Sequence, residues 1–365
     1  MAGKGSAEHM GISLLLGSDD FGKMRDEGKY YIDKTGIIEA LLNERNEVTL
    51  LTRPRRFGKT LTMTMLEDYF QIGLDSRSHF EGLKITANHE FCEKWMNQWP
   101  TVFLTLKSVV GNEFQVAFER FKILIAEIFR AHDYLAQSTA VNSADVVDFL
   151  SIRDRKASYA LTTNSLKLLT RMMEAHYGKK VIVLIDEYDV PLAKAYEQGY
   201  YDEMLDAIRI LLGESLKTNP SLKFAVITGC LRVSKESIFT GLNNLVNESI
   251  HAGSLGKYIG FTQSEVIKLL RDADIAEHFE EIKEWYDGYN FGGTEMYCPW
   301  DVLNHVKALQ ENPCAEPRAY WINTSENAII KNFLKHANRT TKADIERVIN
   351  GGAVFKPVRE QLTYH

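Results

Sequence analysis

The stretch Arg53-Pro54-Arg55-Arg56-Phe57-Gly58-Lys59-Thr60 decides how this chain is interpreted. It follows a short apolar run, Val48-Thr49-Leu50-Leu51, that predicts a buried strand. Its last three residues complete the phosphate-binding motif G-x-x-x-x-G-K-[ST], whose lysine reaches the outer phosphates and whose hydroxyl binds Mg²⁺. The first glycine of that motif is absent, because Arg53 occupies its place. Taken alone, the stretch is compatible with a P-loop or with a basic turn between a strand and a helix.

A second segment favours the P-loop. Val181-Ile182-Val183-Leu184-Ile185 is an unbroken apolar run, the pattern of a parallel strand buried on both faces. It ends in Asp186-Glu187-Tyr188-Asp189, and carboxylates after such a strand are expected at its carboxyl end, where α/β sheets bind ligands. In P-loop ATPases the first acid organises Mg²⁺ and the second orients the attacking water. The two segments occur in the order that a P-loop nucleotide-binding fold requires.

Composition limits the class of protein. The chain has 365 residues, 45% of them hydrophobic and 25% charged, with a net charge of -6, which gives no general case for nucleic-acid or membrane binding. Its four cysteines form no C-x-x-C pair, so neither a zinc site nor a disulfide framework is predicted and a reducing cytoplasm is expected. The apolar stretch 12–16 is too short to span a membrane.

Alternating strand and helix patterns predict the fold class. We expect an α/β fold with a mostly parallel sheet, flanked by helices on both faces, in the P-loop NTPase class. Residues 1–16 are expected to be a disordered leader, 17–260 the ATPase core, and 261–365 a helical lid with the start of a C-terminal region. The predicted strands are 48–51, 101–106, 181–185 and 223–228, and the predicted helices of the core are 35–42, 59–70, 113–132, 163–176 and 201–216.

The strand at 101–106 bears on mechanism. It places a β-unit between the P-loop strand and the acidic strand, as in ATPases whose catalytic glutamate directly follows the Mg²⁺ aspartate. A neighbouring strand then supplies a polar residue near the γ-phosphate, and Thr228 is the candidate. Arg232 follows and could donate charge-assisted hydrogen bonds to the same phosphate. A plain strand-ending turn at Thr228 and a surface ion pair at Arg232 are equal alternatives.

Five segments together resemble the AAA-ATPase-like family of prokaryotic P-loop proteins, which often carry a PD-(D/E)XK nuclease-like domain after the ATPase. They are Tyr31-Ile32-Asp33-Lys34-Thr35, the stretch 53–60, Leu184-Ile185-Asp186-Glu187-Tyr188-Asp189, Thr228-Gly229 and Trp285-Tyr286-Asp287-Gly288-Tyr289. The resemblance runs from about Gly17 onward. It implies ATP as the nucleotide, a missing first glycine as a family feature, and Asp33 and Lys34 near the base. A helix N-cap is an equally good interpretation of Asp33.

The region after residue 260 resembles the small helical lid of AAA-type ATPases. Thr262-Gln263-Ser264-Glu265 matches a capping box at the start of an amphipathic helix. A helix at 276–286, a glycine-rich turn at 287–293 and a further helix from Pro299 follow. The aromatic residues of this region favour core packing over base stacking.

The nuclease half of such proteins is predicted to be absent. Its chemistry needs an acid followed by Glu-x-Lys or Asp-x-Lys at strand ends around a metal. The match Glu281-Ile282-Lys283 lies in a helical run, where its side chains would not converge. We therefore expect a shortened family member or a truncated piece that carries the ATPase core and lid.

These interpretations combine into Mg²⁺-dependent ATP binding and hydrolysis. Catalytic roles fall to Lys59, Glu187, Thr228 and Arg232, and the metal to Thr60 and Asp186. The nucleotide is expected to contact Arg55, Arg56, Phe57, Gly58, Lys59, Thr60, Leu61 and Asp33. Arg55 and Arg56 could instead act on a neighbouring subunit, contact nucleic acid or form a solvated loop.

Two other functions stay open at this point. One is a nucleotide-regulated switch or scaffold with negligible turnover. The other is a nucleic-acid-processing module that serves an attached or partner nuclease-like domain. Oligomerisation is also left open, because an arginine acting between subunits has the same sequence pattern as one acting within a subunit.

Overall fold

The computed structural model describes residues 11–230, 238–239, 243–248, 255–321, 339–349, 352 and 354. Arg232 and most of the predicted leader lie outside the described residues. The chain divides into two compact units, each assembled from separate stretches. The first unit comprises Met1–Arg45, Arg55–Gln98 and Ile250–Ile322, and the second comprises Asn46–Pro54, Trp99–Ser249 and Asn323–His365. This division differs from the predicted boundary at 260, because residues distant in sequence pack together within each unit.

The second unit contains a parallel sheet. Its strands are β1 (Val48–Thr52), β2 (Thr101–Thr105), β3 (Val181–Asp186), β4 (Leu222–Gly229) and β5 (Leu245–Glu248). In the described residues their order is β2-β3-β4-β1-β5, and every neighbouring pair is parallel. The mostly parallel sheet predicted from the sequence is thereby confirmed. Because all strands run the same way, their carboxyl ends share one edge, with β4 between β1 and β3.

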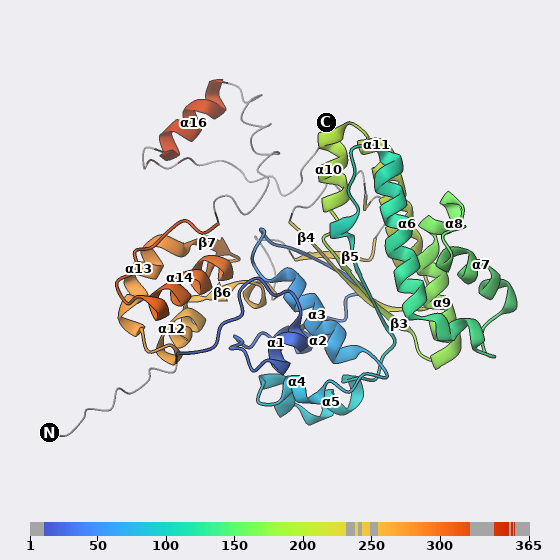
Figure 1. Ribbon diagram of the computed structural model, residues 1–365, viewed down its shortest axis with the longest axis horizontal. Coiled ribbons are helices and arrows are strands. Elements are labelled where there is room, and N and C mark those ends of the chain that lie inside the picture. Colours follow the sequence, from blue (N-terminus) through green and yellow to red (C-terminus); the bar gives the residue numbers. More distant parts are fainter. Residues whose placement is uncertain are drawn as a thin grey trace. The chain divides into compact units, whose positions relative to one another are not determined.

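Helices of the second unit pack on one another and on this sheet (Figure 1). They are α6 (Phe114–Ala131), α7 (Ser143–Arg153), α8 (Tyr159–Thr163), α9 (Ser165–Tyr177), α10 (Val190–Gln198) and α11 (Tyr201–Leu216). The helix α16 (Arg339–Ile349) belongs to the residues of the same unit. The apolar stripe predicted along α6 is buried, with Phe121, Ile125 and Phe129 in the same core as β1 to β4. All residues of β3 are buried, as its unbroken apolar run predicts.

The first unit combines helices with a small antiparallel sheet. Its helices are α1 (Phe21–Asp26), α2 (Gly36–Glu44), α3 (Lys59–Phe70), α4 (Arg77–Phe80), α5 (His89–Trp95), α12 (Gln263–Asp272), α13 (Phe279–Tyr286) and α14 (Pro299–Glu311). Its strands are β6 (Phe261–Thr262), β7 (Asp287–Phe291) and β8 (Thr294–Tyr297), in the order β6-β8-β7.

Two expectations about this unit need correction. The segment 287–293, expected as a glycine-rich turn, forms β7 and the tight turn into β8, because Gly292 and Gly293 both take the positive φ that a hairpin turn favours. The region after residue 260 is therefore not purely helical. Within the predicted leader, Ile12 and Leu14 pack on the α12–α14 core and the amide of Tyr30 donates to the carbonyl of Ser13, so this part is ordered.

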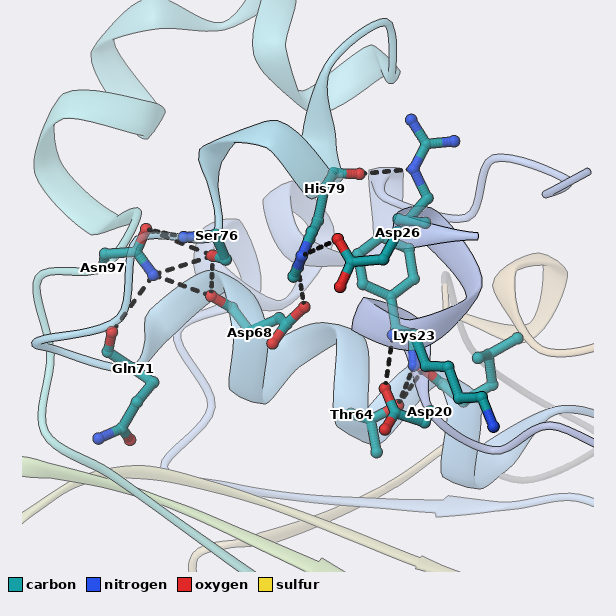
Figure 2. A network of polar contacts seen from close by, with 12 residues as sticks. Asp20, Lys23, Asp26, Thr64, Asp68, Gln71, Ser76, His79 and Asn97 are labelled. Atoms are coloured by element: carbon teal, nitrogen blue, oxygen red, sulfur yellow. Dashed lines mark hydrogen bonds and ion pairs between the residues drawn. The ribbon is translucent and has the colours of Figure 1, made fainter. Parts of the chain in front are cut away.

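A polar network holds the helix α3 in place (Figure 2). His79 bonds Asp68 of α3 through Nδ1 (2.6 Å) and Asp26 of α1 through Nε2 (3.1 Å). Nearer the start of α3, the hydroxyl of Thr64 accepts the amide of Phe21 (3.2 Å). These contacts therefore attach α3, the helix that follows the predicted phosphate-binding loop, to α1 and to His79.

None of the helices in the described ranges combines the length and apolar character needed to cross a bilayer.

Candidate nucleotide site

The predicted phosphate loop has the backbone of an anion-binding turn. Arg56 (φ 71°) and Gly58 (φ 86°) both lie in the left-handed region, which glycine accepts without strain and arginine does not. Such turn conformations direct successive backbone N–H groups into one concavity. The first helical bond of α3 runs from the amide of Thr62 to the carbonyl of Gly58 (3.0 Å), so the amides of residues 59–61 form the N-terminal end of the helix. Lys59 itself is 3% exposed.

Arg53 is a structural cross-link where the motif normally has a glycine. Its side chain is 1% exposed, and its Nη1 donates to the carbonyls of Thr52 (2.7 Å) and Glu248 (3.1 Å). Its amide donates to the carbonyl of Gly229 (3.2 Å), so one residue joins β1 to both of its neighbours, β4 and β5. Burial lowers the pKa of Arg53 to about 10, and nearby Glu248 opposes that shift. Arg53 is not among the positive-φ residues, so its backbone does not require glycine.

The next three residues of the loop differ in their surroundings. Arg55 is exposed. Arg56 lies with its guanidinium over the ring of Trp300, 4.3 Å from the centroid, and Phe57 is buried among aromatic rings of the same unit. These contacts are additional to the backbone contacts with phosphate that the sequence predicted for residues 56 and 57.

In the second unit, polar side chains from three neighbouring strands meet at the carboxyl edge. Asp186, the last residue of β3, is fully buried. The hydroxyl of Thr228 on β4 donates to its Oδ1, and the hydroxyl of Thr105 on β2 donates to its Oδ2 (3.4 Å). A buried carboxylate is tolerated only when its oxygens are bonded in this way. Thr228 therefore does more than end a strand.

Thr105 did not stand out in the sequence. The signal that could have found it was its position as the final polar residue of a strand that pairs with β3, and pairing order is not visible in one sequence. The register that aligns Thr105 with Asp186 supplies the missing information.

The residue after Asp186 is held in an unusual backbone state. Glu187 has φ 54°, the left-handed region, which costs on the order of 1 kcal/mol for a residue with a side chain. The turn around it is fixed by the amide of Tyr188, which donates to the carbonyl of Thr228 (3.1 Å), and by the amide of Cys230, which donates to Asp189 (3.0 Å). A Cβ at Gly229 would lie 2.6 Å from Tyr188 and 2.8 Å from Asp189, so the Thr228-Gly229 pair has a steric reason.

Asp33 and Lys34 make contacts inside the first unit. Asp33 accepts from the amide (2.9 Å) and hydroxyl (2.6 Å) of Thr35 and from the amide of Lys84 (2.7 Å). These bonds hold the segment just before α2, whose N-cap is Thr35 and whose start has no side-chain cap bond, so Asp33 is not the N-cap. A role of Asp33 beside the base stays a prediction. Lys34 is buried and pairs with Glu265 (2.5 Å).

The oxygen donors present suit Mg²⁺. Thr60 is the second residue of α3, and Asp186 is a strand-end carboxylate whose neighbours are hydroxyls. Hydroxyl and carboxylate oxygens are hard ligands, and Mg²⁺ in nucleotide sites needs only one or two carboxylates because phosphates and water complete its shell. A self-sufficient cluster of three or more His, Cys, Asp or Glu side chains does not occur in the described part of the chain.

The predicted site residues fall in both units. Lys59, Thr60 and Leu61 belong to the first unit, and Asp186, Glu187 and Thr228 to the second. That the two groups converge on one triphosphate stays a prediction, and Arg232 lies outside the described residues.

Comparison with known proteins identifies the family. Residues 15–239, more than half of the chain, match the AAA-ATPase-like family, described as a predicted AAA-ATPase. The chain belongs to this family, as its sequence segments indicated. An uncharacterized protein in the vnfD 5′ region of Azotobacter chroococcum mcd 1 is 27% identical over 344 residues, which cover 94% of this chain. The match spans 60% of that relative's length.

One solved structure that the chain matches is the Walker-type ATPase PABY2304 of Pyrococcus abyssi. The match covers 87% of this chain and 75% of that chain at 14% identity, with a TM-score of 0.40. At that TM-score the similarity carries no argument about this chain.

Proposed function

We propose that this protein binds ATP with Mg²⁺ and hydrolyses it. The observation that carries the proposal is Asp186, a fully buried carboxylate bonded by strand-end hydroxyls on both sides and followed by Glu187 in a left-handed backbone state. Strained residues and costly buried charges persist where function requires them. Membership of a family described as predicted AAA-ATPases supports the same activity.

The proposed binding step uses the loop and the start of α3. The backbone amides of residues 56–61 surround the β-phosphate, and the ammonium of Lys59 lies against the β and γ oxygens. Thr60 and Asp186 are the residues that would hold Mg²⁺. A bound Mg²⁺ would supply positive charge that neutralises the negative charge developing on the outer phosphates.

The proposed chemical step uses Glu187 and Thr228. Glu187 accepts a hydrogen bond from the attacking water, orients it in line with the γ-phosphorus and takes its proton as the new P–O bond forms. Thr228 keeps the Asp186 carboxylate fixed and faces the γ-phosphate. The bond from the γ-phosphorus to the β–γ bridging oxygen breaks, ADP leaves with its electron pair, and inorganic phosphate is the other product.

The test is Mg²⁺-dependent phosphate release combined with ATP binding. Lys59→Ala is expected to lose both, because the outer phosphates lose their cation. Glu187→Gln is expected to keep ATP binding and lose turnover by a factor of about 10² or more, because the amide accepts no proton. The exposed residues Lys84→Ala and Glu284→Gln serve as matched controls and should behave as wild type.

The outcomes separate the candidate functions. If Glu187→Gln hydrolyses ATP as fast as wild type, the assigned base is wrong. If wild type binds ATP but releases no phosphate above background, the protein is a nucleotide-dependent switch. A nucleic-acid-processing role would be marked by stimulation of turnover by DNA or RNA that falls steeply with added salt. Cytoplasmic location and any oligomer or nuclease-like partner remain expectations from the sequence.

A further inference from the structure

Phe57 anchors the phosphate loop in the C-terminal part of the first unit. Its ring is 1% exposed and meets Tyr289 edge-on, with centroids 4.8 Å apart and an interplanar angle of 80°. It also packs against Phe291, with centroids 5.5 Å apart. Both partners belong to β7, more than two hundred residues further along the chain. A side chain from the middle of the loop is therefore part of the β7–β8 hairpin's packing.

The absence of a side chain at Gly260 leaves room for the Phe57 ring. Gly260 has φ 105°, and a Cβ there would lie 2.8 Å from Cδ1 of Phe57 and 2.9 Å from Cε of Met296. The space that the absent side chain would need is occupied by the phenylalanine ring. Gly260 directly precedes β6, so the residue that leads into this strand lies against the ring.

A second contact connects the adjacent loop residue to α14. The guanidinium of Arg56 stacks over Trp300, and the thiol of Cys298 lies 3.8 Å from the carbonyl of Arg56. Burial is the largest of the effects that raise the pKa of the Cys298 thiol to about 12, so this contact is made by a neutral thiol. Arg56 and Phe57 thus each reach a different element of the same part of the first unit.

We infer that Phe57 and Arg56 are positioning residues that couple occupancy of the phosphate loop to the β7–β8 hairpin and the start of α14. Any movement of the loop backbone on phosphate binding displaces Phe57, and Phe57 cannot move without moving the rings packed on it. Closely packed interiors respond to such a shift as a whole, because they have little free volume to absorb it. The inference rests on the proposed nucleotide binding. It adds which residues transmit the effect of a bound nucleotide to the C-terminal part of the first unit.

The direct test is hydrogen exchange of the full chain with and without ATP and Mg²⁺, followed by mass spectrometry of peptides that cover 287–297. In wild type, ATP is expected to slow exchange in the hairpin at least severalfold. The peptide that covers α7 (Ser143–Arg153) provides an internal reference. Phe57→Ala should abolish the change in the hairpin even at ATP concentrations that restore full occupancy.

A double-mutant cycle tests the contact itself. Phe57→Ala and Tyr289→Ala are each expected to weaken ATP binding about tenfold, and the double variant about tenfold rather than a hundredfold, because one contact is removed only once. Trp285→Ala is the matched control, since Trp285 is an exposed aromatic residue of α13 beside the same hairpin. It should bind ATP as wild type does.

Each result decides one question. If wild type fails to bind ATP, the proposed function fails and the coupling fails with it. If wild type binds ATP while exchange in 287–297 is unchanged, the coupling alone is wrong. Multiplicative effects of Phe57→Ala and Tyr289→Ala would likewise overturn it. The wild-type exchange measurement requires no variant to fold, and Phe57→Leu, which keeps apolar volume and loses the ring, provides a milder substitution.

Discussion

The buried carboxylate at the carboxyl edge of the sheet depends on individual hydrogen bonds. Asp186 has no exposed surface, and its two oxygens are bonded by hydroxyls from β2 and β4. Removing a donor from a buried carboxylate costs more than the bond itself contributes, because the charge then remains desolvated. The hydroxyls of Thr105 and Thr228 therefore fix the position of this acid.

Thr228→Val tests this dependence. Valine has nearly the shape of threonine and lacks the hydroxyl, so Asp186 loses one donor. We expect the free energy of unfolding to fall by about 1–3 kcal/mol and ATP turnover to fall about 10–100-fold, with a smaller change in ATP affinity. Thr228→Ser, which restores the donor, should recover most of the turnover. Denaturant unfolding and steady-state phosphate release measure the two effects, and wild-type turnover in Thr228→Val would contradict the assigned role.

Glu67 on α3 makes stability depend on pH. Burial, with smaller contributions from Asp68 and Asp20, raises the pKa of Glu67 to about 7 from an ordinary value of 4.5. The folded state then holds a proton that the unfolded state releases between these two values. The contribution of Glu67 to the free energy of unfolding is therefore greatest below pH 4.5, and it is lost as the pH rises to about 7.

Glu67→Gln should remove this dependence. The variant is expected to match wild type near pH 5 and to be more stable by about 1–2 kcal/mol at pH 8, a value reduced because the side chain is partly exposed. Urea unfolding at the two pH values measures the difference. The exposed Glu93→Gln is the control, and an equal effect of Glu67→Gln at both pH values would show that its carboxyl is not perturbed.

At the scale of elements, α12 is held by its own cap and by a residue from far away. The hydroxyl of Thr262 and the carboxylate of Glu265 form the capping box that the sequence predicted. The same carboxylate pairs with Lys34, whose pKa is lowered by burial and raised in part by Glu265. Tyr30 adds a second bond, to Asp272 at the end of the helix (2.5 Å). The segment 30–34 thus holds α12 at both ends.

Glu265→Ala should be costly for this reason. It removes the reciprocal cap bond and leaves the buried ammonium of Lys34 without its carboxylate, so we expect a loss of about 2–4 kcal/mol in the free energy of unfolding. Lys34→Met together with Glu265→Gln removes both charges and keeps the cap, and it should recover much of that loss. Glu284→Ala, on the exposed side of α13, is the control. A loss below about 1 kcal/mol would place the pair among weak surface ion pairs.

Helices and strands with a clear periodicity of apolar residues could be predicted from the sequence. Strands that form only by pairing with another strand could not. The helices α3 and α11 begin and end at the predicted residues, because their apolar stripes and flanking residues are local signals. The strand β5 was missed, since Leu-Val-Asn-Glu is short and half polar and becomes a strand only by pairing with β1. The hairpin β7–β8 was missed because its glycines resemble a loop.

The candidate site follows the same rule. Asp186 and Thr228 could each be predicted at the carboxyl edge of the sheet, because each lies at the end of a strongly apolar strand. The hydrogen bond between them was not predicted. The role of Arg53 as a cross-link between strands could not be predicted, because its hydrogen bonds depend on which strands flank β1. The aromatic contacts of Phe57 were also hidden, since they join segments far apart in the sequence.

In the whole molecule, one of the points at which the chain crosses between the two units lies inside the phosphate loop. The chain passes from the first unit into the second at β1 and returns at Arg55, in the middle of the loop motif. The cation and amides proposed to bind phosphate therefore belong to one unit, and the acids proposed to bind Mg²⁺ and water belong to the other. That these two groups act on one bound nucleotide stays a prediction.

Ligand-linked stability tests that prediction. Binding of ATP to the folded state alone adds about 2.7 kcal/mol at a hundredfold excess over Kd, which should raise the Tm of the chain by several degrees. Lys59→Ala should lose this shift with or without Mg²⁺. Asp186→Asn should retain the smaller shift seen with ATP alone and lose the additional part that Mg²⁺ provides in wild type. Because a Tm shift does not require turnover, Glu187→Gln is the control that should keep the full effect. If Asp186→Asn keeps the whole Mg²⁺-dependent increase in Tm, Asp186 and the phosphate loop do not bind the same nucleotide.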